Sequence, residues 1–351
     1  MKRVNKIFVL AISLITLFPA IRLTAGNEDR SGQAGASELL INPWGRSSGW
    51  GGANSATVRG LESVYMNVAG SAFTTKTELI FSRTNWLKGS GVNINTFGLS
   101  QRVSETSVIS LSVMAMSFGD IQVTTVDLPE GGIGTFSPNL MNIGISYAKA
   151  FSNSIYGGIT FKIISESISD ATAQGVALDA GIQYVTGEAE NIKFGISLKN
   201  VGPRMKFKGD GLSFRGFIPG NDNQFTVEHR SAEFELPSLI NIGAAYDFHI
   251  NNNNRLTAAG NFTSNSFTKD QYILGLEYGF KSYLMLRAGY TYEKGIFTMA
   301  DRTTAYTGPC GGFTVEIPLN KEKGSSFGLD YSYRTSDPFQ GTHCIGVRIN
   351  L

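Results

Sequence analysis

The chain has 351 residues, with 30 Lys and Arg against 28 Asp and Glu and a formal net charge of +2. A charge this nearly balanced excludes a surface built for polyanions, so no nucleic-acid partner is expected. Charged residues make up only 17 %, while 41 Gly, 23 Phe and 13 Tyr are present, and no linker or step in composition divides the chain. One large β-domain is therefore expected rather than two soluble domains.

Residues 1–25 are predicted to be a secretory signal peptide. Three basic residues precede the apolar run IFVLAISLITLF at 7–18, and the small residues Thr24-Ala25-Gly26 follow. The apolar run is too short for a transmembrane helix, and Pro19 interrupts it. The mature protein is therefore expected to be exported.

Residues 26–76 are rich in small side chains and do not alternate between apolar and polar ones. Such a stretch does not suit a membrane-spanning strand. A barrel of about fourteen strands has a lumen larger than its own side chains can fill. The segment is therefore predicted to fold into the lumen of the barrel that follows, as a hatch or plug.

From Thr77 to Leu351, apolar residues recur at every second position in runs of about ten residues, the length of a tilted membrane-spanning strand. In QYILGLEYGF at 271–280, the tyrosines and leucines share one parity and Glu277 lies on the other. Charges keep to the polar parity because an ionised Arg or Lys facing lipid at mid-depth costs about 2 to 4 kcal/mol. The pattern predicts an all-β fold, a transmembrane antiparallel β-barrel over 77–351. Its roughly fourteen predicted strands lie near 77–87, 92–103, 107–118, 140–151, 154–164, 176–186, 191–200, 238–250, 255–263, 271–280, 283–293, 309–319, 326–334 and 342–351.

The predicted connections alternate in length. Short ones follow the even-numbered strands, as periplasmic turns do, and longer ones tend to follow odd-numbered strands and are predicted to face outward. The long connections are 119–139, 165–175, 201–237 and 293–308. The last strand alternates up to Leu351, and its pairing with the first strand would remove both sheet edges from the lipid.

The connection 201–237 is rich in aromatic and basic side chains, and two interpretations of it stay open. Apolar side chains concentrated in an exposed loop often mark a partner surface. Alternatively, the loop folds inward over the lumen and buries them. The residues assigned to partner binding are Arg204, Phe207, Phe214, Arg215, Phe217 and Phe225.

The sequence contains no motif for catalysis, metal binding or cofactor binding. The three histidines have no second His or Cys at ligand spacing, and no GxSxG, P-loop or strand-to-helix GxGxxG occurs. No enzyme activity, metal or cofactor is therefore expected. Charged residues of both signs share the lumen parity, so mutual compensation is favoured over catalysis. They are Asp247, Glu277, Glu293, Asp330, Arg287, Arg334 and Arg348.

Cys310 and Cys344 are the only cysteines, and an exported protein invites a disulfide between them. They are predicted to lie two strands apart, roughly 9 to 10 Å at about 4.8 Å per strand. That distance is too long for an unstrained bridge unless the rim bends inward. The sequence is therefore compatible with a disulfide between the two cysteines and with two free thiols.

The stretch GWGGANSATVRGLESVYMNVAG at 49–70 is similar to the N-terminal motif of FadL-type barrels and of the PorV/PorQ family, and ASELLINPWGRSSGWGG at 36–52 looks like the PorV/PorQ version. Val68 stands where the family usually has Pro, and Met66 separates the aromatic residue from the Asn. The residues assigned to the hatch motif are Trp44, Gly49, Gly51, Gly52, Tyr65, Asn67 and Gly70. The simpler alternative is that these glycines serve only close backbone contact and that Tyr65 only packs.

The resemblance implies an outer-membrane protein of the type IX secretion system, in a Gram-negative bacterium of the Bacteroidota. Such a protein binds cargo through the cargo's folded C-terminal signal domain and shuttles it, or anchors partner subunits at the cell surface. The implied partners are outer-membrane lipids, secreted cargo proteins and secretion-machinery subunits. The shared motif leaves open a FadL-like channel with a hydrophobic ligand in the lumen, whereas a general porin would need a lumen free of the hatch.

Overall fold

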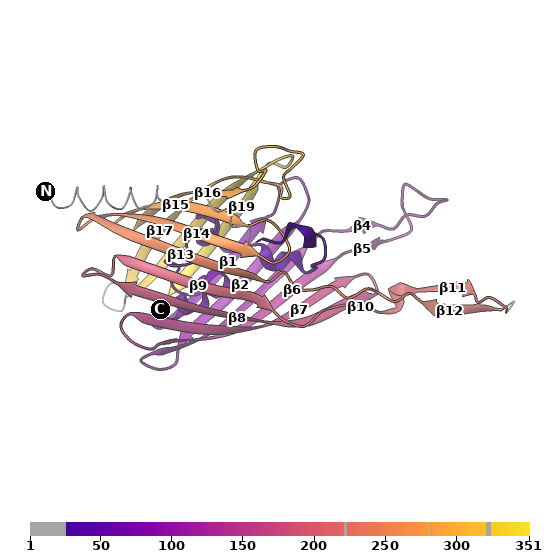
Figure 1. Ribbon diagram of the computed structural model, residues 1–351, viewed down its shortest axis with the longest axis horizontal. Coiled ribbons are helices and arrows are strands. Elements are labelled where there is room, and N and C mark those ends of the chain that lie inside the picture. Colours follow the sequence, from indigo (N-terminus) through magenta and orange to yellow (C-terminus); the bar gives the residue numbers. More distant parts are fainter. Residues whose placement is uncertain (1–25, 221–222, 282, 321–323) are drawn as a thin grey trace.

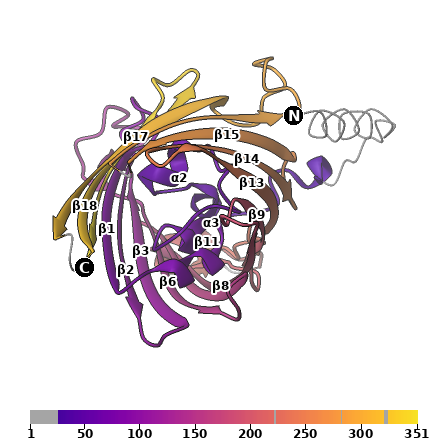
Figure 2. The ribbon, with the colours of Figure 1, turned by 90° about the vertical axis from the view of Figure 1, so that its left-hand side faces the viewer.

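The computed structural model describes residues 26–220, 223–281, 283–320 and 324–351, which form a closed antiparallel β-barrel (Figures 1 and 2). The predicted fold class is confirmed, and each of the fourteen predicted strands is present. The wall strands are β1(Thr77–Asn85), β2(Asn93–Arg102), β3(Ser107–Ser117), β6(Asn139–Ala150), β7(Ile155–Ile168), β8(Ala171–Thr186), β9(Ile192–Val201), β13(Leu239–Asn251), β14(Asn254–Asn265), β15(Gln271–Phe280), β16(Leu284–Glu293), β17(Tyr306–Asn320), β18(Ser325–Ser336) and β19(Thr342–Asn350). The predicted signal peptide lies outside the described residues.

The barrel closes between its first and last strands. β1 pairs with β19 in a continuous register from Glu78 opposite Asn350 to Asn85 opposite His343. The Leu351 N–H extends this ladder by donating to the Thr77 carbonyl at 2.9 Å. Because lipid offers no hydrogen bonds, closure satisfies backbone groups that an open edge would leave unpaired.

Side chains alternate between an apolar outer face and a more polar inner face. On β15, Leu274 is 70 % exposed on the outside and Glu277 is 7 % exposed on the inside. Ile273 breaks this pattern, because it points inward and packs with Trp50 and Ala53. Apolar residues of the inner face therefore occur where the wall meets other protein rather than water.

Residues 36–74 run through the interior of the barrel and are called the lumenal segment below (Figure 2). It contains η2(Ser37–Leu40), α2(Gly45–Gly49), α3(Ser63–Met66) and η3(Val68–Phe73), and two further short helices are η1(Glu28–Arg30) and η4(Asp210–Leu212). Within the described ranges, none of the helices has the length and apolar character needed to cross a membrane.

The three longest connections lie at one end of the barrel, and the connections at the opposite end are short turns (Figure 1). Two of the three longest connections project as two-stranded ribbons. Short turns of outer-membrane barrels face the periplasm, so the ribbons mark the outer end. The ribbons are β4(Ile121–Gln122) with β5(Thr135–Phe136), and β11(Ser213–Phe217) with β12(Gln224–Glu228).

The predicted connection at 165–175 lies at the outer end, as expected, but it is much shorter than predicted. β7 continues to Ile168 and β8 begins at Ala171, so only Ser169 and Asp170 turn the chain. A two-residue turn with a positive φ of 51° at Ser169 suits the twist of two paired strands. The hydrogen-bonded ladder of β7 and β8 therefore includes most of 165–175, from Ser165 opposite Gln174 to Ile168 opposite Ala171. The short strand β10(Phe207–Lys208) pairs with this extension of β8.

Candidate functional site

An apolar cluster holds the lumenal segment against β1. Trp44, which is 1 % exposed, packs with Leu61 and Val64 of the segment and with Ile80 of the wall. Burial of one large apolar side chain stabilises a fold by about 1.5 to 3 kcal/mol. The hatch-motif residue Trp44 therefore lies in the contact between the segment and the wall.

Asn67 fastens the segment to β8 and β9. Its side-chain amide donates to the backbone carbonyls of Ser55, Ile182 and Ile196 at 3.0, 3.0 and 3.4 Å. Gly181 leaves the necessary room, since a Cβ there would lie 2.2 Å from the Asn67 Oδ1. Asn67 is 1 % exposed, so losing this donor in a site shielded from water would cost about 1 to 3 kcal/mol.

The hatch-motif glycines differ in whether their backbone conformation or their close contacts require glycine. Gly51 and Gly52 have φ values of 66° and 97°, a region that only glycine adopts without strain. A Cβ on Gly70 would lie 2.1 Å from the Val58 carbonyl oxygen, whereas one on Gly49 would meet its nearest atom at 3.4 Å. Backbone conformation and close contact therefore account for three of these glycines, as the simpler alternative supposed, but do not account for Gly49.

Tyr65 connects two parts of the segment with the wall. Its hydroxyl donates to the Leu39 carbonyl at 2.7 Å, and the Lys199 Nζ of β9 lies 3.7 Å from the centre of its ring. Burial raises the pKa of Tyr65 well above its usual value, so the hydroxyl remains a donor. An ammonium is attracted to the face of an aromatic ring, so Tyr65 does more than fill space.

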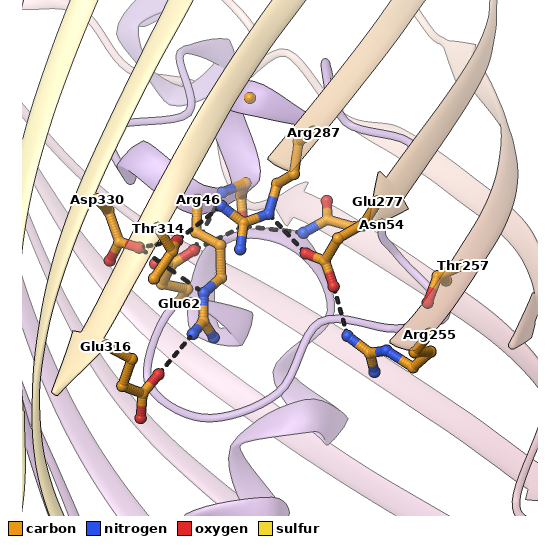
Figure 3. Close-up of polar contacts among 12 residues, drawn as sticks. Arg46, Asn54, Glu62, Arg255, Thr257, Glu277, Arg287, Thr314, Glu316 and Asp330 are labelled. Atoms are coloured by element: carbon orange, nitrogen blue, oxygen red, sulfur yellow. Dashed lines mark hydrogen bonds and ion pairs between the residues drawn. The ribbon is translucent and has the colours of Figure 1, made fainter. Parts of the chain in front are cut away.

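A network of charged side chains joins the segment to the wall (Figure 3). Arg46 of α2 lies 3.8 Å from Glu316 and 4.0 Å from Asp330, and Arg348 contacts the same two carboxylates at 3.2 and 3.8 Å. Beside them, Glu62 of the segment accepts hydrogen bonds from Ser47, at 3.1 Å from its backbone N–H and 3.0 Å from its hydroxyl. The wall carboxylates are therefore shared between a wall arginine and an arginine of the segment.

The same network continues toward β14, where Arg287 and Arg255 hold Glu277 from two sides at 2.6 and 2.5 Å. The predicted charge compensation is therefore confirmed for Glu277 and its partner Arg287, and likewise for Asp247, Asp330 and Arg348. Loss of one partner would leave the other charge buried and unpaired, so these pairs couple the elements that carry them.

The two other lumen-parity charges have partners of a different kind. Glu293 accepts hydrogen bonds from Gln271 and Thr303, both at 3.1 Å. The guanidinium of Arg334 lies 4.0 Å from the centre of the Tyr306 ring. Among the residues that the structure describes, neither Glu293 nor Arg334 forms an ion pair, so the predicted charge compensation does not hold for these two.

Two cavities flank the lumenal segment. One of about 310 Å³ lies toward the short-turn end and is lined by charged residues that include Glu190 and Arg255. The other, of about 540 Å³, lies toward the outer end, where Trp86, Tyr306 and Lys199 contribute to its lining. The two linings have no residue in common, and residues of the lumenal segment contribute to both.

Cys310 and Cys344 are both free thiols, so the disulfide that the sequence left open is not formed. β18 pairs with β17 on one side and β19 on the other and therefore separates the two cysteines. Each thiol donates instead to a carbonyl of the lumenal segment, Cys310 to Gly49 at 3.5 Å and Cys344 to Pro43 at 3.4 Å. The barrel wall does not bend in a way that would bring the sulfurs together.

The connection between β9 and β13 has two parts. One part folds inward over the lumen, and the other is exposed as a partner surface would be. Phe207 on β10 folds inward, where it packs against Phe234 with ring centres 5.9 Å apart and against an apolar cluster that includes Leu39. Arg204 forms an ion pair with Glu235 at 3.0 Å. This first part of the connection covers the lumen.

The four remaining residues assigned to partner binding lie on the β11–β12 ribbon. Phe214, Phe217 and Phe225 are 45, 65 and 37 % exposed. The strand register places Phe214 and Phe225 on one face and Arg215 and Phe217 on the other. Both faces of the ribbon therefore present aromatic side chains beyond the barrel.

Two features were not predicted from the sequence. One is the role of Arg46 in the charged network. The sequence feature that could have indicated it is a single charged residue within the small-residue run GRSSG. The other is the β4–β5 ribbon, on which Val126, Leu128 and Ile133 are 99, 52 and 52 % exposed. The sequence feature that could have indicated this ribbon is the presence of large apolar side chains in a polar connection. The same feature indicates a partner surface in 201–237.

The family model "Type IX secretion system membrane protein PorP/SprF" matches residues 68–349. The chain belongs to the PorP/SprF family. The family and the closed barrel support an outer-membrane location for this PorP/SprF protein. The type IX secretion system is confirmed, but the resemblance to PorV/PorQ is not, because PorP/SprF is a different family. The motif that carried that resemblance lies at 36–70, almost entirely outside the matched region.

The fold of this PorP/SprF protein is similar to solved structures of toluene transporters. TodX of Pseudomonas putida is 13 % identical with a TM-score of 0.54, and the alignment covers 88 % of this chain and 97 % of that one. TbuX of Ralstonia pickettii is 11 % identical with a TM-score of 0.53 and the same coverage. At these identities the likeness shows the fold alone. A comparison with curated proteins gives no match.

Proposed function

We propose that this PorP/SprF protein is a non-enzymatic component of type IX secretion that binds a partner protein at the cell surface. The partner is a secreted cargo protein, held through its C-terminal signal domain, or a subunit of the machinery. The observation that carries the proposal is the β11–β12 ribbon, which projects from the outer end of the barrel (Figure 1). Three of its phenylalanines are exposed.

The ribbon has the properties that protein recognition requires. Aromatic residues and Arg are enriched at interfaces, and Phe217 shares a face with Arg215. β11 and β12 form a sheet of only two strands, so each offers an edge to an incoming strand. Recognition outside the membrane also agrees with a lumen occupied by residues 36–74.

The test is to replace the three phenylalanines by serine in the full chain, F214S/F217S/F225S, and to purify the protein from native membranes. We expect recovery of its co-purifying partner to fall at least about tenfold, because aromatic residues at the centre of an interface often contribute 2 kcal/mol or more each. Quantitative mass spectrometry measures recovery, and heat-modifiable gel migration checks that the barrel has folded.

A matched control removes three exposed apolar side chains from the neighbouring ribbon, V126S/L128S/I133S. The control should retain the partner. Unchanged recovery with the phenylalanine variant would contradict the proposal.

A second candidate function is a channel for hydrophobic small molecules. The outer cavity of about 540 Å³ favours it, since Trp86, Phe118 and Tyr306 form part of the lining. Against it, Lys199 and Arg334 line the same cavity. Native mass spectrometry with a monoaromatic probe distinguishes the two, because only the channel requires a bound hydrophobic molecule.

A further inference from the structure

The outer face of β7 and β8 changes from apolar to polar at a single level. The outward-facing pairs, taken toward the outer end, are Leu178 with Phe161, Val176 with Ile163, Gln174 with Ser165 and Thr172 with Ser167. The apolar band of an outer-membrane barrel ends where lipid headgroups begin. The step from Val176 to Gln174 therefore marks the outer boundary of the hydrocarbon region.

Basic side chains lie just beyond this boundary. β10 pairs with the extension of β8, with Lys208 opposite Thr172. Phe207 faces inward, so Lys206 and Lys208 on either side of it face outward, and both are exposed. Together with Arg204 they line a cavity of about 350 Å³ that also includes Thr172.

The cavity has an excess of positive charge. Within the described ranges, Lys206 and Lys208 have no ion-pair partner. Arg204 shares the carboxylate of Glu235 with Arg30, both at 3.0 Å, so a single acid faces two guanidinium groups. Glu233 is the one carboxylate among the described lining residues. Counting Arg30 and Glu235 as well, the group has four cations against two acids at headgroup depth, an excess that is complementary to an anion.

We propose that this cavity binds a phosphate group of a phosphorylated glycolipid in the outer leaflet. The phosphate lies among Arg204, Lys206 and Lys208, and the hydroxyl of Thr172 is a further donor. The acyl chains run down the wall over the apolar strip that contains Val176. A free phosphate would use the same donors but would gain nothing from that strip. The site is separate from the β11–β12 ribbon and does not depend on the proposed function.

The experiment uses the full chain in detergent, with diphosphorylated lipid A as the probe and native mass spectrometry as the readout. The variant K206Q/K208Q should bind the probe about thirtyfold more weakly, and each single variant about fivefold, since each lysine near an anionic lipid contributes about that factor. The matched control K76Q/K88Q removes two exposed lysines outside the cavity and should bind like the unaltered protein.

Two further arms identify the ligand chemistry. Dephosphorylated lipid A should bind the unaltered protein as weakly as diphosphorylated lipid A binds the double variant. Inorganic phosphate at millimolar concentration should not displace lipid A. Equal binding by the unaltered protein and K206Q/K208Q, or equal binding of both lipid forms, would overturn the proposal. Complete displacement by inorganic phosphate would overturn the lipid as its source.

Discussion

At the scale of single residues, Glu38 shows how the lumen alters the chemistry of a side chain. It lies on η2 of the lumenal segment and is 2 % exposed. Burial, and then the charge of Glu166, raise the pKa of Glu38 from 4.5 to about 7. A buried carboxyl without a close counter-charge favours its neutral form. The contact between segment and wall therefore contains a group that titrates near neutral pH.

Replacing Glu38 by Gln should change the pH dependence of stability. Because the folded-state pKa is raised, the stabilising contribution of Glu38 is fully present below about pH 4.5 and is lost as the pH rises to about 7. The loss is roughly 3 kcal/mol at most. Gln is neutral throughout, so E38Q should gain stability relative to the unaltered protein at pH 8 but not at pH 4.

The measurement is the unfolding temperature of both proteins in detergent at the two pH values. E105Q, which changes an exposed carboxyl in the turn between β2 and β3, is the control and should behave the same at both. A stability difference for E38Q that does not change with pH would contradict the prediction.

At the scale of elements, strand order decides what neighbouring residues can do. Cys310 on β17 and Cys344 on β19 have the same lumen-facing parity, and β18 holds them apart. Adjacent strands lie about 4.8 Å apart, so two intervals exceed the span of a disulfide. The same strands also position Glu316 and Asp330 where Arg46 of α2 reaches both.

We expect both thiols to react with iodoacetamide after the chain is unfolded without a reductant. Cys344 is buried and Cys310 is half-buried in the folded barrel, so complete alkylation should require unfolding but not reduction. Intact-mass measurement counts the added groups. Alkylation that occurs only after reduction would show a bond between Cys310 and Cys344.

At the scale of the whole molecule, the lumenal segment occupies the interior of the barrel and has a cavity on either side. The lumenal segment is bound to β1 through Trp44, to β8 and β9 through Asn67 and to β17 and β18 through Arg46. Contacts distributed around the wall hold the segment more firmly than a single contact would. The two cavities are lined by different residues.

The purified barrel should therefore conduct little current in planar bilayers, well below an open porin measured in the same membranes. The reason for this expectation is that buried side chains and paired charges of the segment and the wall occupy much of the cross-section. A stable conductance at porin level would contradict a closed lumen and would favour a general porin.

The candidate site could be predicted from the sequence only in part. Alternation placed Glu277, Asp330, Arg287 and Arg348 in the lumen, because lipid excludes charge from the other parity. Alternation could not show that Arg46 contacts Asp330, because that contact depends on where α2 packs against the wall. Whether an aromatic residue of 201–237 faces inward, as Phe207 does, likewise depends on packing between distant segments.

The sequence by itself determined the closed barrel of fourteen strands, because hydrocarbon imposes a two-residue rhythm on each strand that crosses it and requires paired edges. Only the tertiary structure decided where β7 and β8 end, since their hydrogen bonds continue beyond the lipid after the rhythm has stopped. It also decided why Ile273 points inward, because a side chain of the wall responds to whatever fills the lumen, here Trp50.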